Sequence, residues 1–306
     1  MKLDSMTLAN VLVAMQGRRI LVIGDVMLDQ FVDGDVKRIS PEAPVPILSK
    51  TNSRQMPGGA ANVACNLAYL GCHVRLIGIT GKDKAAQTLQ DEIEKAPGLE
   101  FAPFVVDGRP TSVKTRFRAG GQQILRGVAE VREPLGSEDA SQLVNIITAY
   151  INTADIIVLS DYAKGCLQPS AIAKVLKSAK AAGKVVIADP KLADFAAYAD
   201  VDVLTPNLAE LQSATQSELS NIDDIARISA KLAKEHRIGA IMATLSARGV
   251  LLASASGDTT HIPAMARDVF DVSGAGDTVV ATFTASIAAG VDFATAASIA
   301  NLAASI

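Results

Sequence analysis

Continuous apolar runs alternate with helical patterns over most of the chain. The runs at 19–24, 74–79 and 155–160 consist mainly of apolar residues, which is typical of strands buried on both faces. Further strands are predicted at 101–106, 184–188, 201–204 and 239–243, and helices at 5–16, 138–151, 169–182 and 221–236. Because strands that alternate with helices form parallel sheets, we expect an α/β fold with a mostly parallel central sheet and helices on both faces.

The region after the first predicted strand follows a different pattern. Short alternating segments at 31–36 and 45–50 flank the turn Ser40-Pro41-Glu42-Ala43-Pro44. This pattern indicates two short strands of a small β flap outside the parallel sheet. We predict that the flap, or lid, comprises about 29–50 and 111–131.

Composition narrows the class of protein. The chain has 306 residues, of which 49% are hydrophobic and 20% charged, which is enough for one large α/β domain or two small ones, and we expect a single domain over 1–306. The net charge of -3 and the absence of tryptophan favour neither nucleic acid nor anionic lipid as a partner, and no apolar run reaches membrane-spanning length. The cysteines and histidines lack metal-ligand or catalytic spacing. We therefore expect a cytoplasmic protein without nucleic-acid or membrane partners.

Two small-residue motifs each open a predicted helix. Pro57-Gly58-Gly59-Ala60-Ala61-Asn62 begins a helix that ends near Gly71, and its glycines allow a ligand to approach the backbone. Close helix packing explains the same residues equally. Asp271-Val272-Ser273-Gly274-Ala275-Gly276-Asp277-Thr278 leads into an apolar run that ends at Gly290, and it combines glycines with the unpaired N–H groups and positive dipole of a helix start. The second motif therefore predicts an anion site.

An acid directly behind an anion site needs a reason, because it repels anions. Asp277 fits a general base that takes a proton from a hydroxyl group while nearby N–H groups hold a transferring phosphoryl group. The alternative is that Ser273 and Asp277 form a capping pair on a tightly packed helix.

Basic residues gather in the second lid segment. Alternation places Lys114, Arg116 and Arg118 on one face of a strand, and Gly120-Gly121 forms a hairpin turn after it. A solvated basic edge is the default interpretation of such a run. Because the chain is otherwise mildly acidic, we favour an anion-binding face, where arginine offers bidentate contacts to phosphate.

Polar residues recur just after the predicted strands, and in an open α/β sheet these strand ends share one edge. They are Asp25, Asp161, Lys164, Asp189, Lys191, Asn207, Thr244 and Ser246. Asp25 and Asp29 could accept hydrogen bonds from sugar hydroxyls, although turn capping explains them as well. Asn207 and Glu210, three residues apart, could orient Mg²⁺ through water.

Two common nucleotide-binding motifs are missing from the sequence. There is no G-x-x-x-x-G-K-[ST], and no G-x-G-x-x-G follows the first strand, which excludes P-loop enzymes and classical dinucleotide-binding domains. A shared edge with carboxylates, an Asn/Glu pair and an anion-binding helix start instead fits phosphoryl transfer from a nucleotide, since such catalysis is mostly positioning and charge stabilisation.

Three ordered motifs resemble those of the ribokinase (carbohydrate kinase) family. Asp271-Val272-Ser273-Gly274-Ala275-Gly276-Asp277 resembles the family's C-terminal signature, Gly58-Gly59-Ala60-Ala61-Asn62 its N-terminal signature, and Asn207-Leu208-Ala209-Glu210 its N-x-x-E motif. Four more segments are similar to the heptose 7-phosphate kinase branch of this family: 24–29, 38–46, 114–116 and Asp161-Tyr162-Ala163-Lys164-Gly165.

The resemblance implies a ribokinase-like fold and an ATP-dependent sugar kinase with Mg²⁺ and a monovalent cation. The implied reaction phosphorylates D-glycero-β-D-manno-heptose 7-phosphate at its anomeric C1 hydroxyl, giving the 1,7-bisphosphate for ADP-heptose and lipopolysaccharide core synthesis. That activity stands alone in some bacteria and is the first domain of a bifunctional kinase/adenylyltransferase in others. A homodimer through the lid strands is also implied. The rival hypotheses are a kinase for another sugar, such as ribose, fructose or a keto-deoxy acid, and a non-catalytic sugar-phosphate-binding protein on the same fold.

The resemblance and the basic run together assign roles to individual residues. Asp277 is the base, and Gly274, Ala275 and Gly276 form the anion hole. The sugar-binding candidates are Asp25, Asp29, Gly58, Gly59 and Asn62, and the candidates for the 7-phosphate are Arg116, Arg118, Arg126, Lys164 and Lys191. The nucleotide-binding candidates are Asn207, Glu210, Thr244, Ser246, Gly249, Asp271 and Ser273, of which Asn207 and Glu210 also serve the metal through water.

The sequence departs from the family pattern at two places. Gly127-Val128-Ala129-Glu130 stands where the family carries an acidic segment. The chain also ends at Ile306, inside the last predicted helix, where the family continues, so we expect the domain to be truncated there.

Overall fold

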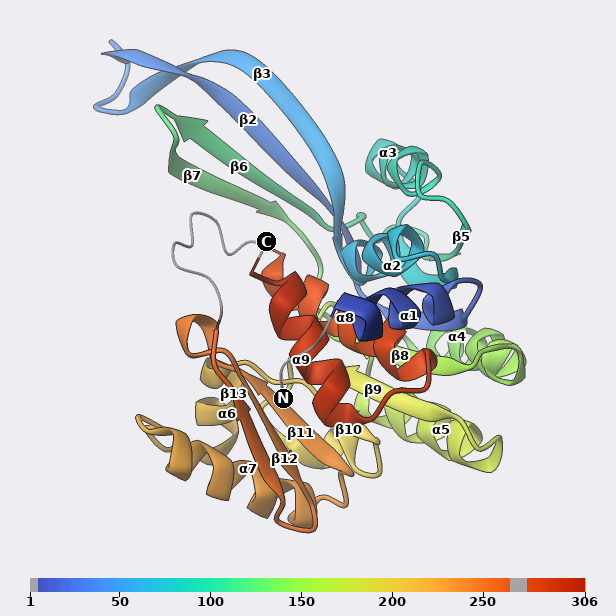
Figure 1. Ribbon diagram of the computed structural model, residues 1–306. Helices are drawn as coiled ribbons and strands as arrows, with labels where there is room; N and C mark the ends of the chain where they lie inside the picture. Colours follow the sequence, from blue (N-terminus) through green and yellow to red (C-terminus); the bar gives the residue numbers. More distant parts are fainter. Residues whose placement is uncertain (1–4, 265–273, 306) are drawn as a thin grey trace.

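The computed structural model describes residues 5–264 and 274–305, shown in Figure 1. Within them, nine strands form a large central sheet. In spatial order these are β13 (Thr259–Ile262), β12 (Val250–Ser254), β11 (Ala240–Thr244), β10 (Val203–Leu204), β9 (Val185–Asp189), β8 (Ile156–Ser160), β1 (Arg19–Gly24), β4 (His73–Thr80) and β5 (Leu99–Val105). The strands from β11 to β5 are parallel, and β12 is antiparallel to both of its neighbours. The predicted mostly parallel sheet is therefore confirmed.

Helices cover both faces of this sheet, as predicted (Figure 1). One face carries α1 (Ser5–Met15), α2 (Ala60–Tyr69), α3 (Lys84–Ile93), α8 (Ala275–Ala288) and α9 (Phe293–Ala303). The other carries α4 (Ser137–Tyr150), α5 (Pro169–Ala181), α6 (Leu208–Thr215) and α7 (Ile222–Glu235). Short 3₁₀ helices occupy Ile151–Thr153, Phe195–Tyr198 and Ser246–Arg248. No helix in the described part of the chain is long and apolar enough to span a membrane.

The side chains of β1 pack into hydrophobic clusters on both faces of the sheet. Ile20 and Val22 pack into the hydrophobic cluster that α1, α2, α8 and α9 cover. Leu21 and Ile23 point the other way, into the cluster that α4, α5 and α7 cover. Successive residues of a strand face opposite sides, so a strand with helices on both sides must be apolar at every position.

A separate four-stranded sheet forms the lid, which extends away from the main body in Figure 1. Its order is β3 (Pro46–Gly59), β2 (Val26–Ile39), β6 (Val113–Ala119) and β7 (Gln122–Ala129). β2 pairs antiparallel with β3 and parallel with β6, and β6 and β7 form the predicted hairpin around Gly120-Gly121. Both glycines of that turn have positive φ, as a tight hairpin turn requires.

The lid strands differ from the sequence prediction in length. β2 and β3 each have 14 residues, so the short strands predicted at 31–36 and 45–50 are only parts of them. Pro57-Gly58-Gly59, predicted to begin a helix, instead ends β3, and the helix begins at Ala60. Most of β3 is exposed on both faces, and such a strand has no alternation of apolar residues that would reveal its bounds.

Candidate active site

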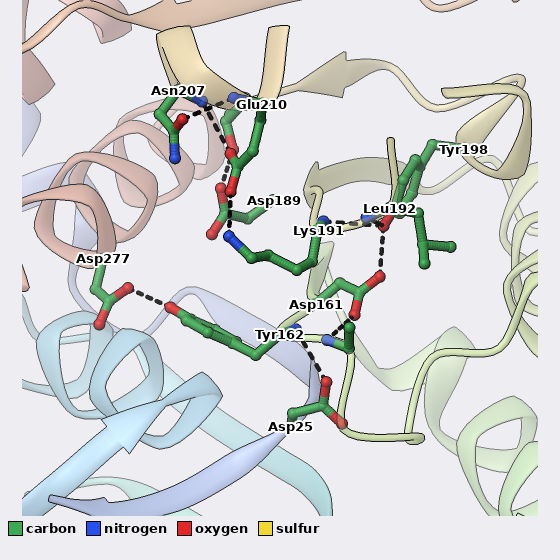
Figure 2. A network of polar contacts seen from close by, with 12 residues as sticks. Asp25, Asp161, Tyr162, Asp189, Lys191, Leu192, Tyr198, Asn207, Glu210 and Asp277 are labelled. Carbon is green, nitrogen blue, oxygen red and sulfur yellow. Dashed lines mark hydrogen bonds and ion pairs between the residues drawn. The ribbon is translucent and has the colours of Figure 1, made fainter. Parts of the chain in front are cut away.

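The carboxyl ends of the parallel strands and the starts of α6 and α8 enclose a cavity of about 200 Å³. Its lining includes Asp161, Tyr162, Asp189, Glu210 and Asp277, most of which Figure 2 shows from close by. Lys191, Asn207, Thr244 and Gly276 line it as well. The structure thus brings together residues from five separate segments, as the strand-end pattern predicted.

Asp277 lies in the first turn of α8 and is held at both carboxylate oxygens. Its Oδ2 accepts a hydrogen bond from Asn62 Nδ2 at 2.7 Å, and its Oδ1 accepts one from the hydroxyl of Tyr162. Burial raises the pKa of this carboxyl above its ordinary value, while the Tyr162 and Asn62 hydrogen bonds lower it. A raised pKa makes a carboxylate a stronger base at neutral pH.

The two glycines beside Asp277 have different surroundings. Gly274 is the N-cap of α8 with φ 87°, a left-handed conformation that favours glycine, and a Cβ there would lie only 3.2 Å from Asn62 Nδ2. Gly276 is exposed, and a Cβ there would meet no atom of the described residues within 4 Å. Unpaired N–H groups at a helix N-terminus with open space before them are suited to a phosphate or phosphoryl group.

Asp25 and Asp29, both predicted to bind sugar hydroxyls, have different surroundings. Asp25 is buried, and its carboxylate accepts three backbone N–H groups of the loop after β8. Asp29 lies on β2, where it accepts a hydrogen bond from Arg116 at 2.8 Å. The Asp29 carboxylate also packs closely against Gly58, where a Cβ would stand only 2.6 Å from Asp29 Oδ2. Gly59, at φ 60°, similarly faces the carbonyl oxygen of Asp25.

Four of the five cations predicted to hold a phosphate are ion-paired. The pairs are Arg116–Asp29 at 2.8 Å, Arg118–Asp33 at 2.7 Å, Lys164–Glu130 at 2.6 Å and Lys191–Glu210 at 2.9 Å. A paired cation attracts a phosphate less strongly, because its carboxylate repels the same anion. Glu130, which stands in the segment that departs from the family, thus engages Lys164.

Lys114 and Arg126 differ from these cations, because neither is ion-paired within the described residues. The Lys114 ammonium lies 5.5 Å from the centre of the Tyr162 ring. Burial lowers the pKa of Lys114, and the charge of Asp29 raises it while those of Arg126, Lys164 and Arg116 lower it. A half-buried ammonium among other cations indicates a site for an anion. Lys114 belongs to the basic run of the sequence but was not among the residues predicted to bind the phosphate.

Asn207 and Glu210 form a capping box at the start of α6. Asn207 Oδ1 accepts the Glu210 N–H at 2.9 Å, and Glu210 Oε2 accepts the Asn207 N–H at 3.0 Å. Asp189 lies beside Glu210, and burial followed by the Glu210 charge raises the pKa of Asp189. From the sequence, Asp189 was predicted only as a polar residue at a strand end.

These residues suit a hydrated Mg²⁺ more than a fully caged metal. No cluster of three or more metal-ligating side chains exists in the described ranges 5–264 and 274–305. Mg²⁺ keeps several of its waters and is usually bound by one or two carboxylates together with substrate phosphates. Asn207 and Glu210, predicted to orient Mg²⁺ through water, are compatible with such a contact, and Asp189 lies beside Glu210.

The predicted nucleotide-binding residues lie in two groups. Thr244 at the end of β11 lines the cavity, and its backbone forms an isolated parallel β-bridge with Asn207. Ser246 and Gly249 lie in the turn between β11 and β12 and do not line it. A Cβ on Gly249, at φ 86°, would meet the Ile262 carbonyl oxygen at 2.0 Å, so this turn requires glycine. Asp271 and Ser273 lie outside the described residues.

The contribution of Asp161 to the free energy of unfolding depends on pH. Burial raises its pKa to about 6 from an ordinary value of 3.8, although hydrogen bonds from Tyr198 and Ala163 lower it. The folded protein therefore holds this proton more tightly than the unfolded chain, so the contribution of Asp161 to stability is greatest below pH 3.8 and falls as the pH rises through 6. Asp161→Asn is expected to remove this loss, which is about 3 kcal/mol. Urea unfolding at pH 4 and pH 7 tests this, because the variant should gain stability over the wild type only at the higher pH. An equal difference at both pH values would contradict it.

In chemical terms, the cavity places the half-buried carboxylate of Asp277 at the start of a helix, with cations on the lid side. This arrangement can accept a proton from a hydroxyl group while N–H groups hold developing negative charge, which is what phosphoryl transfer to an alcohol requires. The chain belongs to the pfkB family of carbohydrate kinases, since the family model matches residues 18–306. The predicted class, a phosphotransferase acting on a sugar hydroxyl, is confirmed by this match.

Two relatives, each named bifunctional protein HldE, are similar to most of this chain. The protein of Gluconacetobacter diazotrophicus is 44% identical over 290 residues, and that of Azorhizobium caulinodans is 45% identical over 288 residues. Each alignment covers 94% of this chain, but 59% and 60% of the respective relative. The chain thus spans about three fifths of the length of these relatives.

Solved structures share the fold. Phosphofructokinase-2 from Escherichia coli has a TM-score of 0.79 at 20% identity and covers 95% of this chain and 93% of its own. Arabidopsis thaliana ribokinase complexed with ribose and ATP has a TM-score of 0.71 at 21% identity and covers 95% of this chain and 92% of its own. The predicted ribokinase-like fold is confirmed.

Proposed function

We propose that this chain transfers the γ-phosphoryl group of ATP to the anomeric C1 hydroxyl of D-glycero-β-D-manno-heptose 7-phosphate. The observation that carries the proposal is the position of Asp277, a half-buried carboxylate in the first turn of α8 that lines a cavity formed by strand ends. The relatives named HldE and the motifs of the heptose 7-phosphate kinase branch support the choice of sugar. The product would be the 1,7-bisphosphate, a precursor of ADP-heptose for lipopolysaccharide.

In this reaction Asp277 takes the proton of the C1 hydroxyl. The C1 oxygen forms a bond to the γ-phosphorus as the bond between that phosphorus and the β–γ bridging oxygen breaks, and ADP leaves with the electron pair. The N–H groups of Gly274, Ala275 and Gly276 hold the charge on the transferring group. Asn207 and Glu210 would hold a Mg²⁺ ion through water, and that ion would supply charge neutralisation for the phosphates. Thr244, Ser246, Gly249, Asp271 and Ser273 would contribute to nucleotide binding.

The sugar lies on the lid side of Asp277 in this proposal. Asp29, Gly58 and Asn62 face its hydroxyls, and the 7-phosphate lies against Lys114 and Arg126, the cations without a carboxylate partner in the described residues. Arg116, Arg118 and Lys164 surround that position with their ion pairs intact. The unpaired Lys114 thus favours a phosphorylated sugar over a neutral one.

Coupled measurement of ADP release tests the substrate directly. With Mg²⁺ and ATP, we expect turnover on the heptose 7-phosphate to exceed that on the same heptose without phosphate by at least about 100-fold in kcat/KM, because a charge-assisted phosphate contact contributes about 3 kcal/mol. Equal turnover on both would contradict the phosphate site and favour a kinase for another sugar. ATP and sugar-phosphate binding without any turnover would favour the non-catalytic binding protein.

We also propose that two copies of this chain associate through their lids. The lid exposes Ile39, Val45 and Leu125, which are 60%, 51% and 60% exposed, and such apolar side chains are suited to cover one another in a dimer. Leu125→Glu is expected to weaken the dimer by about 100-fold, because an unpaired carboxylate would be buried. Val105→Glu, at a 51% exposed valine on β5 outside the lid, is the matched control. Sedimentation velocity over a concentration series measures both, and a monomeric wild type would contradict the proposal.

A further inference from the structure

The loop after β8 connects two acids of the site that are far apart in the sequence. Figure 2 shows contacts that run from Asp25 through Tyr162 to Asp277. We propose that Tyr162 is a positioning residue that orients the carboxylate of Asp277 for catalysis, and that Asp25 holds Tyr162 in place. This inference rests on the proposed role of Asp277 as the base.

Asp25 anchors the loop after β8 through its carboxylate. Its Oδ2 accepts the N–H groups of Tyr162 and Lys164, both at 2.9 Å, and its Oδ1 accepts the N–H of Cys166 at 3.0 Å. Asp25 is only 2% exposed and has no ion pair within the described residues, so these three amides carry its charge. A carboxylate engaged in this way determines the path of the loop backbone.

The turn at Ala163 has a strained backbone, which the contacts of this loop must offset. Ala163 has φ 53°, a left-handed conformation that costs an L-residue about 1 kcal/mol. Its N–H donates to Asp161 Oδ1 at 2.7 Å, and Arg109 holds the Lys164 carbonyl oxygen. With Ala163 turned in this way, the three amides converge on Asp25 while the side chain of Tyr162 points into the cavity.

Tyr162 in turn contacts Asp277, the proposed base. The Tyr162 hydroxyl donates to Asp277 Oδ1, while Asn62 donates to Oδ2 from the opposite side. Burial and the charge of Asp277 raise the pKa of Tyr162 well above its ordinary value, so the hydroxyl stays a donor. With one donor on each oxygen, the carboxylate cannot rotate freely, and its remaining lone pairs face the cavity.

The surroundings of Asp277 define what the loss of the Tyr162 hydroxyl would do. The titratable or charged groups that face it are Tyr162 after β8, Asp29 on β2, Lys114 on β6 and Asp189 on β9. Tyr162 and Lys114 lower the pKa of Asp277, whereas burial and Asp29 raise it. Without the hydroxyl, Asp277 binds its proton more tightly, and the base becomes available only at higher pH.

The test is the pH profile of kcat/KM for Tyr162→Phe, with Tyr150→Phe as the matched control. Tyr150 lies on α4, stacked on Arg75 and away from the cavity. We expect Tyr162→Phe to lower kcat about tenfold and to move the acid limb about one pH unit higher, since a hydrogen bond to a charged group contributes on that scale. Tyr150→Phe should leave both unchanged. A limb at the wild-type position in Tyr162→Phe would overturn the inference.

A double-mutant cycle tests the role of Asp25. Asp25→Asn should move the acid limb in the same direction as Tyr162→Phe, and adding Asp25→Asn to Tyr162→Phe should move it little further, because Asp25 acts through Tyr162. Independent, additive shifts would show that Asp25 does not act in this way. Asp277→Asn separates the inference from the proposed function: an active Asp277→Asn variant would refute the base itself, whatever Tyr162 does.

A second measurement keeps the test decisive if Tyr162→Phe folds poorly. Replacing the four tyrosines with 3-fluorotyrosine keeps every hydroxyl but makes each a stronger hydrogen-bond donor. The acid limb of the otherwise unchanged protein should then move to lower pH. An unmoved limb would contradict a role of the Tyr162 hydroxyl in setting the state of Asp277.

Discussion

Asp277→Asn is expected to lower kcat for sugar phosphorylation by about 1,000-fold. The asparagine has nearly the same shape and can still accept a hydrogen bond from Tyr162 or Asn62, but it cannot take a proton from the acceptor hydroxyl. General base catalysis contributes about 100- to 10,000-fold, so its loss should dominate over any change in binding. ADP release measured with saturating ATP and sugar phosphate gives the rate, and binding of both substrates should persist.

The stability of the same variant separates lost chemistry from lost structure. Burial raises the pKa of Asp277, so the folded protein must keep a carboxylate ionised where the neutral form is favoured. Removing that charge should leave Tm at neutral pH equal to or higher than that of the wild type. Asp292→Asn is the matched control, because Asp292 is the exposed N-cap of α9 and asparagine caps a helix equally well. A kcat for Asp277→Asn within tenfold of wild type would refute the base.

The sequence was informative where local chemistry determines structure. The continuous apolar run at 20–24 in β1 predicted a strand buried on both faces, since only such a strand lacks polar positions. Asn207 and Glu210 could be placed together because a three-residue spacing at a helix start fixes their contact. The shared edge of the sheet followed from the alternation of strands and helices alone.

The ion pairs and hydrogen bonds between charged residues of the site could not be predicted from the sequence, because their partners are far apart along the chain. Arg116 and Asp29 lie on strands 87 residues apart, and only the parallel pairing of β6 with β2 brings them together. Tyr162 meets Asp277 across 115 residues. The basic run showed that cations gather on the lid, but which cation lacks a carboxylate depends on lid register, and the exposed strands of the lid carry no pattern that specifies register.

Lys114→Met tests whether Lys114, which has no ion pair within the described residues, binds the sugar phosphate. The substitution is expected to lower the ratio of kcat/KM for heptose 7-phosphate to kcat/KM for plain heptose by about 10- to 100-fold. A charge-assisted contact to phosphate contributes about 1.5–3 kcal/mol, and methionine keeps most of the buried stem while removing the charge. Lys114 also lowers the pKa of Asp277, so the variant should lose some activity on every sugar. That loss is common to both substrates, and the ratio of kcat/KM for heptose 7-phosphate to kcat/KM for plain heptose cancels it.

The ratio therefore isolates the phosphate contact, provided that the charge change itself is controlled. Lys37→Met makes the same substitution on the same sheet, at an exposed lysine of β2 paired with Asp35, and should leave the ratio unchanged. If the Lys114→Met ratio also stays at the wild-type value, Lys114 does not face the sugar phosphate. The ion-paired arginines of β6 would then have to release Asp29 and Asp33 to bind it, and Asp29→Asn would strengthen rather than weaken the binding of the phosphorylated sugar.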